Sequence, residues 1–505
     1  MREDSGKARI ILIGCGPHAE RLYLPALRKL NHLDLALVVD LKPREAEVRD
    51  AVDRKWGGDP ELLFVDPFKE ALPDDLHRRL SAFVHEQGIR GVIIATEPLV
   101  HRAYADWALD NGLSILLDKP ISARANSTTC LASAEQILGD YVALLNKYRS
   151  LQRRQETLFT VNTQRRFHPG FQFVEEQIRE IGERTGCPVT SIHSYHCDGQ
   201  WRLPSEIVTQ SYHPYCYGYG KASHSGYHIF DMMYRFYAAA GVRDKFADTL
   251  EIVSSFIQPN GFIRQLTEDD YRGLFGEPYG AVQRWSDDQL REIFQDYGEI
   301  DLSAIITLKK GGDAIANLSV DLIHNGFARR TWVRPGKDLY KGNGRVKHEN
   351  HNIQQGPFQN IQIHSYQAND RHDEANGMEP ELGGKNHFDI YVFRNPMISG
   401  ETPSPRVYRL HEMISEDEMG HRSMLAIEWA KYKVVEELGD YLNGRKDRAS
   451  LRSQIEDHAI PVQMMSGVYR AHILRQRLVS SVFTSSYGLT EGETGDGDRP
   501  RPGAS

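Results

Sequence analysis

The chain has 505 residues, of which 40% are hydrophobic and 26% are charged, and its formal net charge is -8. This length and composition are typical of a globular protein with two or more domains. The negative net charge does not favour a basic surface of the kind that binds nucleic acid. No apolar run approaches the ~20 residues needed to cross a bilayer. Nucleic-acid binding and membrane insertion are therefore not expected.

The first residues are polar, and the sequence shows no secretory or transit segment before the first apolar run at Ile10. We therefore expect a cytoplasmic protein. The five cysteines are widely spaced and lack the short paired spacings of zinc sites and disulfide frameworks. They are expected to be free thiols.

The most informative segment runs from Ile10 to Ala19, where an apolar strand leads into the turn Gly-Cys-Gly-Pro-His-Ala. Gly14, Gly16 and Ala19 have the spacing GxGxxA. The first glycine allows a tight turn, the second lets backbone approach phosphate, and the third small residue lets a helix pack close to the strand. Such turns also occur in methyltransferases and as plain tight turns, but this context favours a dinucleotide site.

A second apolar strand over residues 35–39 ends at Asp40, about 20 residues beyond the glycines. A carboxylate at this point accepts hydrogen bonds from the adenosine ribose and repels a 2′-phosphate, so NAD is favoured as the cofactor. Lys42 and Arg44 follow closely and soften the preference, which keeps NADP possible. The alternative for Asp40 is a solvated turn residue at a strand end.

From residue 8 to residue 148, strands and helices alternate in the manner of a doubly wound parallel sheet. We expect residues 1–148 to form a Rossmann domain that binds NAD(P). The expected strands lie at 10–13, 35–39, 91–95 and 114–117, and the expected helices at 20–30 and 100–110.

Beyond residue 161, longer alternating segments predict an α/β domain over residues 149–485 with a largely antiparallel, open sheet. Two irregular stretches near 258–298 and 325–418 are expected to be elaborated loops or added lobes, and 486–505 a disordered tail. Strands are expected at 189–196, 249–257, 300–308, 314–322, 358–366 and 388–393, and helices at 422–443 and 451–478.

Several motifs occur in order along the chain. A strand ends in Thr96-Glu-Pro98 with His101 three residues on, and the next ends in Asp118-Lys119-Pro120. Farther along come Arg166-Phe-His-Pro and the segment Gly-Lys-Ala-Ser-His-Ser-Gly-Tyr-His-Ile-Phe-Asp over residues 220–231. Together these motifs resemble the Gfo/Idh/MocA oxidoreductase family, with Asp118 in place of the usual glutamate.

The resemblance implies an NAD(P)-dependent oxidoreductase that transfers a hydride between nicotinamide and a sugar, polyol or sugar-like carbinol. It implies a small-molecule substrate and a homo-oligomer, dimer or tetramer, whose contacts involve the open sheet. The cofactor-binding residues that it implies, together with the glycine turn, are Gly14, Gly16, Ala19, Asp40, Thr96, Pro98, His101 and Lys119.

Hydride transfer needs a group that takes the hydroxyl proton, and Lys119 and His228 are the candidates for this role. A lysine held beside the cationic nicotinamide and partly desolvated has a lowered pKa, so it can accept a proton or stabilise an oxyanion. The alternative for Lys119 is a solvated turn residue before proline.

His224 lies four residues before His228, so both occupy one face of a predicted helix. The family usually has aspartate at the position of His224, and a neutral imidazole orients His228 only as a hydrogen-bond partner, so His224 is a candidate for catalysis or for substrate contact. Arg166 and Tyr215 are further substrate candidates. A histidine pair at this spacing can bind zinc, but no third ligand is evident and no metal is expected.

Alternation along residues 193–198 places His196 and Asp198 on one face of a strand, where they line either a cleft or the packed interior. Two other functions remain open. A redox-neutral, NAD-dependent epimerase or glycosidase would remove a hydride transiently and return it. A non-catalytic dinucleotide-binding scaffold would use the long insertions to bind partners.

Overall fold

The computed structural model describes residues 6–334, 344–368, 386–399, 405–413 and 426–490. The first of its two sheets has the order β3-β2-β1-β4-β5-β6, and all neighbouring strands are parallel. The order reverses between β1 and β4, the point beyond whose carboxyl ends open α/β sheets bind their ligands. The strands are β1 Ala8–Ile13, β2 Leu33–Leu41, β3 Glu61–Val65, β4 Gly91–Ile94, β5 Ser114–Asp118 and β6 Phe159–Asn162.

Helices cover both faces of this sheet, because alternate strand residues belong to two separate apolar cores. Side chains of α4, α5 and α6 share one core with Ile11, and those of α2, α3 and α17 share the other with Ile10. The expected doubly wound sheet is thus confirmed. The helices are α1 Pro17–Arg21, α2 Tyr23–Lys29, α3 Glu45–Lys55, α4 Asp74–Gln87, α5 His101–Asp110, α6 Leu131–Gln152 and α17 Ala426–Leu442.

Three details of this domain differ from the sequence-based expectation. The helix expected at 20–30 is broken at Leu22 into α1 and α2, because Pro25 has no amide to bond the carbonyl of Arg21. The edge strand β3 was not expected from its short apolar run. The sheet also continues past residue 148 into β6 and receives α17 from near the end of the chain.

Within the described residues, the second sheet has nine strands in the order β14-β13-β12-β11-β7-β10-β9-β8-β15. Only β7 and β10 pair in parallel, so the largely antiparallel sheet is confirmed. The strands are β7 Ser191–Cys197, β8 Thr249–Ile257, β9 Asp301–Lys310, β10 Asp313–Ile323, β11 Val346–Gln355, β12 Gln359–Ala368, β13 Asn386–Arg394, β14 Arg406–Arg409 and β15 Phe483–Ser486.

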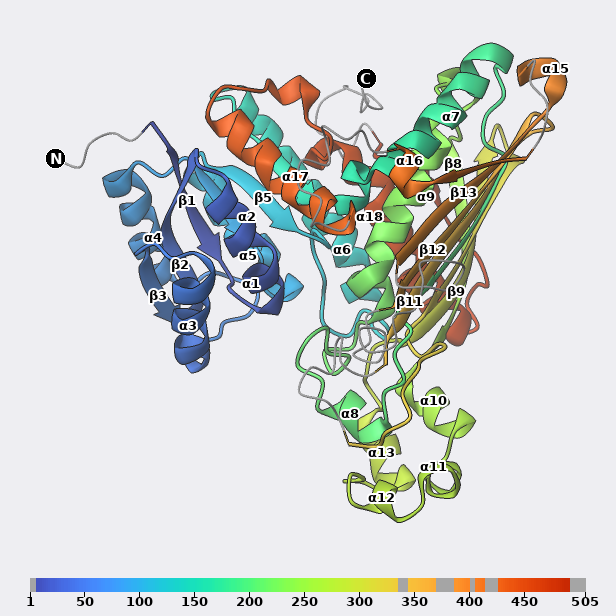
Figure 1. The fold of residues 1–505 in the computed structure, drawn as a ribbon, viewed down its shortest axis with the longest axis horizontal. Helices are drawn as coiled ribbons and strands as arrows, with labels where there is room; N and C mark the ends of the chain where they lie inside the picture. The colour runs from blue at the N-terminus through green and yellow to red at the C-terminus, as the bar shows by residue number, and fades with distance from the viewer. Residues whose placement is uncertain (1–5, 335–343, 369–385, 400–404, 414–425, 491–505) are drawn as a thin grey trace.

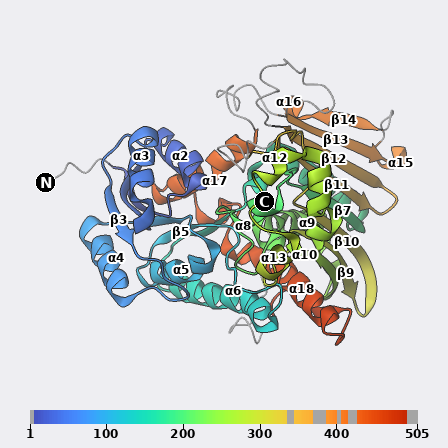
Figure 2. The same ribbon diagram turned by 90° about the horizontal axis from the view of Figure 1, so that it is seen from below.

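Helices α7, α9 and α18 pack against one face of the second sheet (Figure 1). Helix α18 also packs along α6 of the first domain (Figure 2), so one continuous apolar core spans both domains. This continuity fixes the two sheets relative to one another. The helices are α7 Pro169–Thr185, α9 Tyr227–Ala239 and α18 Ala459–Gln476, with the short α15 Pro396–Ser399 and α16 Leu410–Met413 beside β13 and β14.

The first irregular stretch forms a small helical lobe beyond one end of the second sheet (Figure 1). Its apolar centre includes Ile207, Phe262 and Leu290. The lobe contains α8 Pro204–Val208, α10 Pro259–Gln265, α11 Glu268–Phe275, α12 Glu277–Gly280 and α13 Asp287–Ile293.

The second irregular stretch, 325–418, supplies β11 to β14 to the large sheet. Strands β12 and β13 agree with those expected at 358–366 and 388–393, whereas β11 was not expected. Parts of this stretch and most of the expected tail, residues 491–505, lie outside the described residues. Among the described helices, none combines the length and apolarity that crossing a bilayer requires.

Candidate active site

The glycine turn packs tightly against the end of β4. Gly14 has a φ of +88°, and a Cβ added there would lie 2.6 Å from the carbonyl oxygen of Ala95. Its amide donates to the carbonyl of Val39 over 2.8 Å, which ties the turn to β2. Ala19 is fully buried in α1. Only small residues fit at these positions, as expected from the motif.

Asp40 also joins β2 to the glycine turn. Its Oδ2 accepts a hydrogen bond of 2.6 Å from the amide of Cys15, and its Oδ1 accepts one of 2.6 Å from the amide of Leu41. Arg44 lies beside it, with 3.2 Å between Nη1 and Oδ2. The Arg44 Nη1 atom is also 3.5 Å from where a Cβ of Gly16 would stand. Asp40, Gly16 and Arg44 therefore meet at the carboxyl edge of the first sheet.

The side chain of Lys42 points away from the glycine turn. Its ammonium is 2.6 Å from Asp66, and both side chains are more than half exposed. Of the two basic residues expected near the ribose end of a dinucleotide, only Arg44 contacts the glycine turn.

His101 connects the two loops that follow β4 and β5. Its ring is fully buried, with Nδ1 2.8 Å from the carbonyl oxygen of Pro120 and Nε2 3.1 Å from that of Thr96. Pro98 begins the turn that leads into α5. His101 thereby holds the loop carrying Lys119 against the loop carrying Thr96 at the carboxyl edge of the first sheet.

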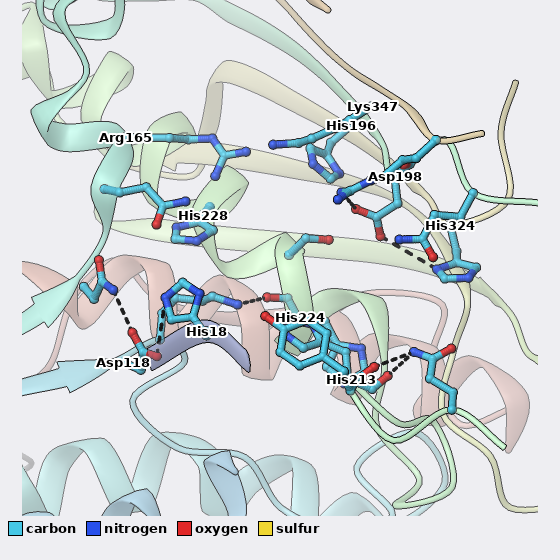
Figure 3. Close-up of a pocket in the computed structure, with 18 of the residues that line it drawn as sticks. His18, Asp118, Arg165, His196, Asp198, His213, His224, His228, His324 and Lys347 are labelled. Carbon is cyan, nitrogen blue, oxygen red and sulfur yellow. Dashed lines mark hydrogen bonds and ion pairs between the residues drawn. The ribbon is translucent and has the colours of Figure 1, made fainter. Parts of the chain in front are cut away.

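A polar pocket lies beyond the carboxyl ends of these strands, between the two domains (Figure 3). Lys119, Tyr215, His224 and His228, all singled out in the sequence, line it. Six basic side chains, six histidines and two carboxylates contribute to its walls. The lining residues that the sequence did not single out for the site include His18, Asp118, Asn162, His324, Arg345, Lys347 and Lys431.

Asp118, at the end of β5, accepts hydrogen bonds from two neighbours. The hydroxyl of Tyr23 donates over 2.5 Å and the amide of Asn162 over 2.7 Å. The Nε2 atom of His18 lies 3.8 Å from its other oxygen. Burial lowers the pKa of His18 to about 4, so its ring is neutral near pH 7. His18 occupies a variable position of the glycine motif, which explains why no sequence signal pointed to it.

Lys119 links the two domains by donating a hydrogen bond to the backbone carbonyl of His224. His224 lies in a π-helical turn, Ala222–Gly226, that precedes α9. Its ring packs against those of His213, Tyr215 and Tyr219, with centroids 4.7, 5.3 and 5.4 Å away. The turn therefore holds the His224 carbonyl toward Lys119, as π-helical turns at functional sites commonly reposition backbone.

His224 and His228 are both neutral near pH 7. Burial is the main cause that lowers the pKa of each ring well below 6.5, and the positive charge of Lys119 contributes to both. Neither ring nitrogen of His224 has a hydrogen-bond partner among the described residues, and Nδ1 of His228 has none. Repulsion between two imidazolium ions does not arise, and His228 can accept a proton at the pocket wall.

Arg166 does not line this pocket. Its guanidinium is 1% exposed and forms a bidentate pair with Asp231, with Nη2 2.6 Å from Oδ1 and Nε 3.0 Å from Oδ2. The preceding residue, Arg165, faces the pocket instead. Tyr215 is buried, and its hydroxyl lies 2.8 Å from Nδ1 of His324. This contact fixes the orientation of its side chain in the pocket wall.

His196, on β7, and Asp198, which directly follows β7, both line the pocket. Asp198 pairs with the buried ammonium of Lys221 and lies 3.4 Å from Nη2 of Arg345. Within the part of the chain that the structure describes, no group of three or more His, Cys, Asp or Glu side chains is arranged to hold a metal ion.

Comparison with known proteins agrees with this architecture. Residues 8–143 match the family model described as an oxidoreductase family with an NAD-binding Rossmann fold. No curated protein sequence matches the chain significantly.

Solved structures of low sequence identity share the fold along nearly the whole chain. An oxidoreductase domain protein from Kribbella flavida has a TM-score of 0.55 and 14% identity, covering 95% of this chain and 99% of its own. An oxidoreductase from Agrobacterium radiobacter, solved with NAD+, L-tartaric acid and magnesium, has a TM-score of 0.53 and 13% identity, covering 95% and 98%. GenD2 from gentamicin A biosynthesis, solved with NAD, has a TM-score of 0.52 and 12% identity, covering 96% and 97%.

The glycine turn, the Asp40 contact and the loops after β4 and β5 all fall within the matched segment. Residues 8–143 of this chain form a Rossmann domain that matches the model of the Gfo/Idh/MocA family, an oxidoreductase family with an NAD-binding Rossmann fold.

Proposed function

We propose that this protein is an NAD(P)-dependent oxidoreductase that transfers a hydride between nicotinamide and a CH–OH carbon of a sugar, polyol or sugar-like molecule. One observation carries the proposal: Lys119 from the first domain and His228 from the second line the same pocket, beyond the strands that bear the glycine turn. When bound at that turn, NAD(P) supplies the hydride acceptor or donor.

The residues of the turn fit such a cofactor. The backbone at Gly14 and Gly16 carries no side chain that would block an approaching pyrophosphate. Asp40 stands at the end of β2, where a ribose hydroxyl would meet its carboxylate. Arg44 lies at the same corner and would meet a 2′-phosphate.

The proton steps fall to Lys119 and His228. In the oxidation direction, the neutral ring of His228 accepts the hydroxyl proton of the substrate as the hydride leaves its carbon. In the structure, the ammonium of Lys119 donates a hydrogen bond to the carbonyl of His224. It would donate to the substrate oxygen in the same way. This hydrogen bond would position that oxygen and stabilise negative charge on it. Reduction reverses both steps.

The cofactor part of the proposal is tested by titrating the purified chain with NADH and, separately, with NADPH while following energy transfer from tryptophan to nicotinamide. Saturable binding of either cofactor is expected. Absence of binding by both would contradict the proposal.

The chemical part is tested with NAD and NADP in the presence of a panel of sugars, polyols and their acidic derivatives, following nicotinamide absorbance at 340 nm. Stoichiometric cofactor reduction with at least one carbinol is expected. Deuterium uptake from solvent into an isomerised product, without a change in absorbance, would instead indicate the redox-neutral reaction.

A further inference from the structure

One wall of the pocket carries a cluster that the proton chemistry does not use: Arg165, His196 and Lys347. Arg165 follows β6 in a short helical turn, His196 belongs to β7, and Lys347 belongs to β11. Strands β7 and β11 are antiparallel, and His196 lies directly opposite Glu349. Because side chains alternate along a strand, Lys347, two residues before Glu349, lies on the same face as His196.

Within the described residues, the carboxylate of Glu349 is paired with Arg165, one of the two cationic side chains of this cluster. Two nitrogens of Arg165 are bound by Glu349, with Nε 2.8 Å from Oε1 and Nη2 2.5 Å from Oε2. Lys347 makes no hydrogen bond or ion pair with the described residues. Figure 3 shows the ends of Arg165 and Lys347 pointing toward one another at the pocket wall, with His196 beside Lys347. Two cations thus face a single shared space, next to one carboxylate.

The electrostatics of Lys347 reflect this arrangement. Burial and, to a lesser extent, the positive charge of Arg165 lower the pKa of its ammonium to about 7, against the opposing effect of Glu349. A negatively charged group placed between Arg165 and Lys347 would relieve this repulsion.

His196 provides an independent sign of a missing partner. Its ring is 1% exposed, and neither Nδ1 nor Nε2 has a hydrogen-bond partner among the described residues. Buried polar atoms are nearly always hydrogen-bonded in folded proteins, so an unpartnered ring that lines a pocket is suited to bind a ligand atom. A neutral imidazole has one N–H, which can donate to an oxyanion.

We propose that Arg165, Lys347 and His196 bind an oxyanion of the substrate, a carboxylate or a phosphate monoester, so that the reactive molecule is an acidic sugar or polyol derivative. The proposal rests on the proposed function, because it assigns the substrate class of the same pocket. His228 lies between this cluster and His18 in the view of Figure 3. One end of the substrate is thereby anchored while its carbinol meets His228 and Lys119.

The anion site is tested first without turnover, by calorimetric titration of the full chain with inorganic phosphate and, separately, with acetate. At least one of the two anions should bind, and Lys347→Met should weaken that binding at least tenfold. Lys310→Met is the matched control, because Lys310 is exposed and lies outside the pocket. Lys347→Arg should restore binding, because the guanidinium retains the charge.

A second variant tests the anion site at a different residue, in case Lys347→Met loses binding through a folding defect. His196→Phe keeps a planar ring of similar size but removes both nitrogens, and it should also weaken anion binding at least tenfold. The NADH titration and the unfolding temperature of each variant report whether the fold is intact. Equal anion affinity in the parent chain and in both pocket variants, or no binding of either anion, would overturn the proposal.

The activity assay then compares each neutral sugar with its phosphate ester and its acid. Higher kcat/KM for one acidic series is expected, with Lys347→Met raising KM at least tenfold and changing kcat less than threefold; the preferred series distinguishes carboxylate from phosphate. Preference for neutral sugars that Lys347→Met leaves unchanged would overturn the substrate assignment. Lys347-dependent anion binding without NADH binding or cofactor reduction would contradict the proposed oxidoreductase while the anion site stands.

Discussion

Lys119 donates a hydrogen bond to the backbone carbonyl of His224. This contact joins the end of β5 in the Rossmann domain to the π-helical turn that leads into α9 of the second domain. The π-helical turn directs a carbonyl at the lysine, so the ammonium is positioned before any substrate arrives. The candidate catalytic group is therefore held by backbone of one domain while its own backbone belongs to the other.

Lys119→Ala should lower kcat by about 10²- to 10⁴-fold, because it removes the group that positions and stabilises the reacting oxygen. The dissociation constant for NADH should change less than about threefold, since the glycine turn and Asp40 are untouched. Steady-state kinetics and fluorescence titration measure the two quantities. Lys69→Ala is the matched control, because Lys69 is an exposed lysine of the same domain. Unchanged turnover in Lys119→Ala would contradict the role of Lys119.

The pH profile should report the environment of His228. Burial, together with the charges of Arg165 and Lys119, lowers the pKa of His228 well below 6.5. The proton-accepting neutral form is therefore fully populated through the ordinary titration range of histidine and is lost only at more acidic pH. The profile of kcat/KM for oxidation should show no fall in activity near pH 6.5. A falling limb centred there would mean that the ring titrates as in water, contrary to the buried geometry.

Arg44 should influence the choice between NAD and NADP. It contacts Asp40 and stands over Gly16, whereas Lys42 pairs with Asp66 in solvent. Arg44→Ala should weaken NADPH binding about tenfold and NADH binding less than about threefold, because only a 2′-phosphate needs the extra cation. Lys42→Ala should leave both affinities unchanged. An equal loss for both cofactors in Arg44→Ala would show instead that Arg44 only supports the turn.

Arg166 should be needed for stability. Arg166→Met would leave the carboxylate of Asp231, which is fully buried, without its bidentate partner. Breaking one side of a buried pair lowers the free energy of unfolding by about 3–5 kcal/mol. Urea denaturation measures the loss, and Arg166→Met combined with Asp231→Leu should recover part of it.

The exposed pair of Arg78 and Asp75 provides the control for this experiment, since Arg78→Met should cost less than about 1 kcal/mol. A raised KM without any loss of stability in Arg166→Met would indicate direct substrate binding by Arg166, as its sequence motif suggested.

Anion binding should weaken as the pH rises above 7. Lys347 has a pKa lowered to about 7, so the free protein loses this charge above that pH, while a bound anion would hold the proton. The dissociation constant should therefore rise by up to about tenfold per pH unit until the pKa of the complex is reached. The groups that act on Lys347 from the packed elements are Arg165, Glu349, Arg345 and Asp198, with His196 alongside.

Lys347→Arg isolates this effect, because a guanidinium stays protonated over the same range. The variant should bind the anion with little dependence on pH between 7 and about 9. The same steep dependence in Lys347→Arg would assign the titration to another group of the cluster.

Local motifs identified several residues that the structure brings together at the carboxyl edge of the first sheet. The glycine turn, Asp40, Lys119 and His101 were all identifiable, because residues that follow parallel strands gather at one edge of the sheet. The pair His224 and His228 was identifiable from helical spacing, although the π-helical turn under His224 was not. The neighbours Arg165 and Arg166 could not be told apart by sequence, since a short helical turn decides which one faces the pocket and which one meets Asp231.

The sequence by itself determined the order of the Rossmann elements, the antiparallel character of the second sheet and the positions of Lys119 and His228, because local periodicity and turn chemistry encode them. Tertiary structure alone decided that Arg165, His196 and Lys347 line one wall of the pocket. Strand β11, with the polar sequence Val-Lys-His-Glu-Asn-His-Asn-Ile-Gln-Gln, has no apolar alternation, and Glu349 and His351 are buried only because β7, β12 and Arg165 pack around them. Burial and charge at Lys347 arise from contacts between segments nearly two hundred residues apart, and no local pattern records them.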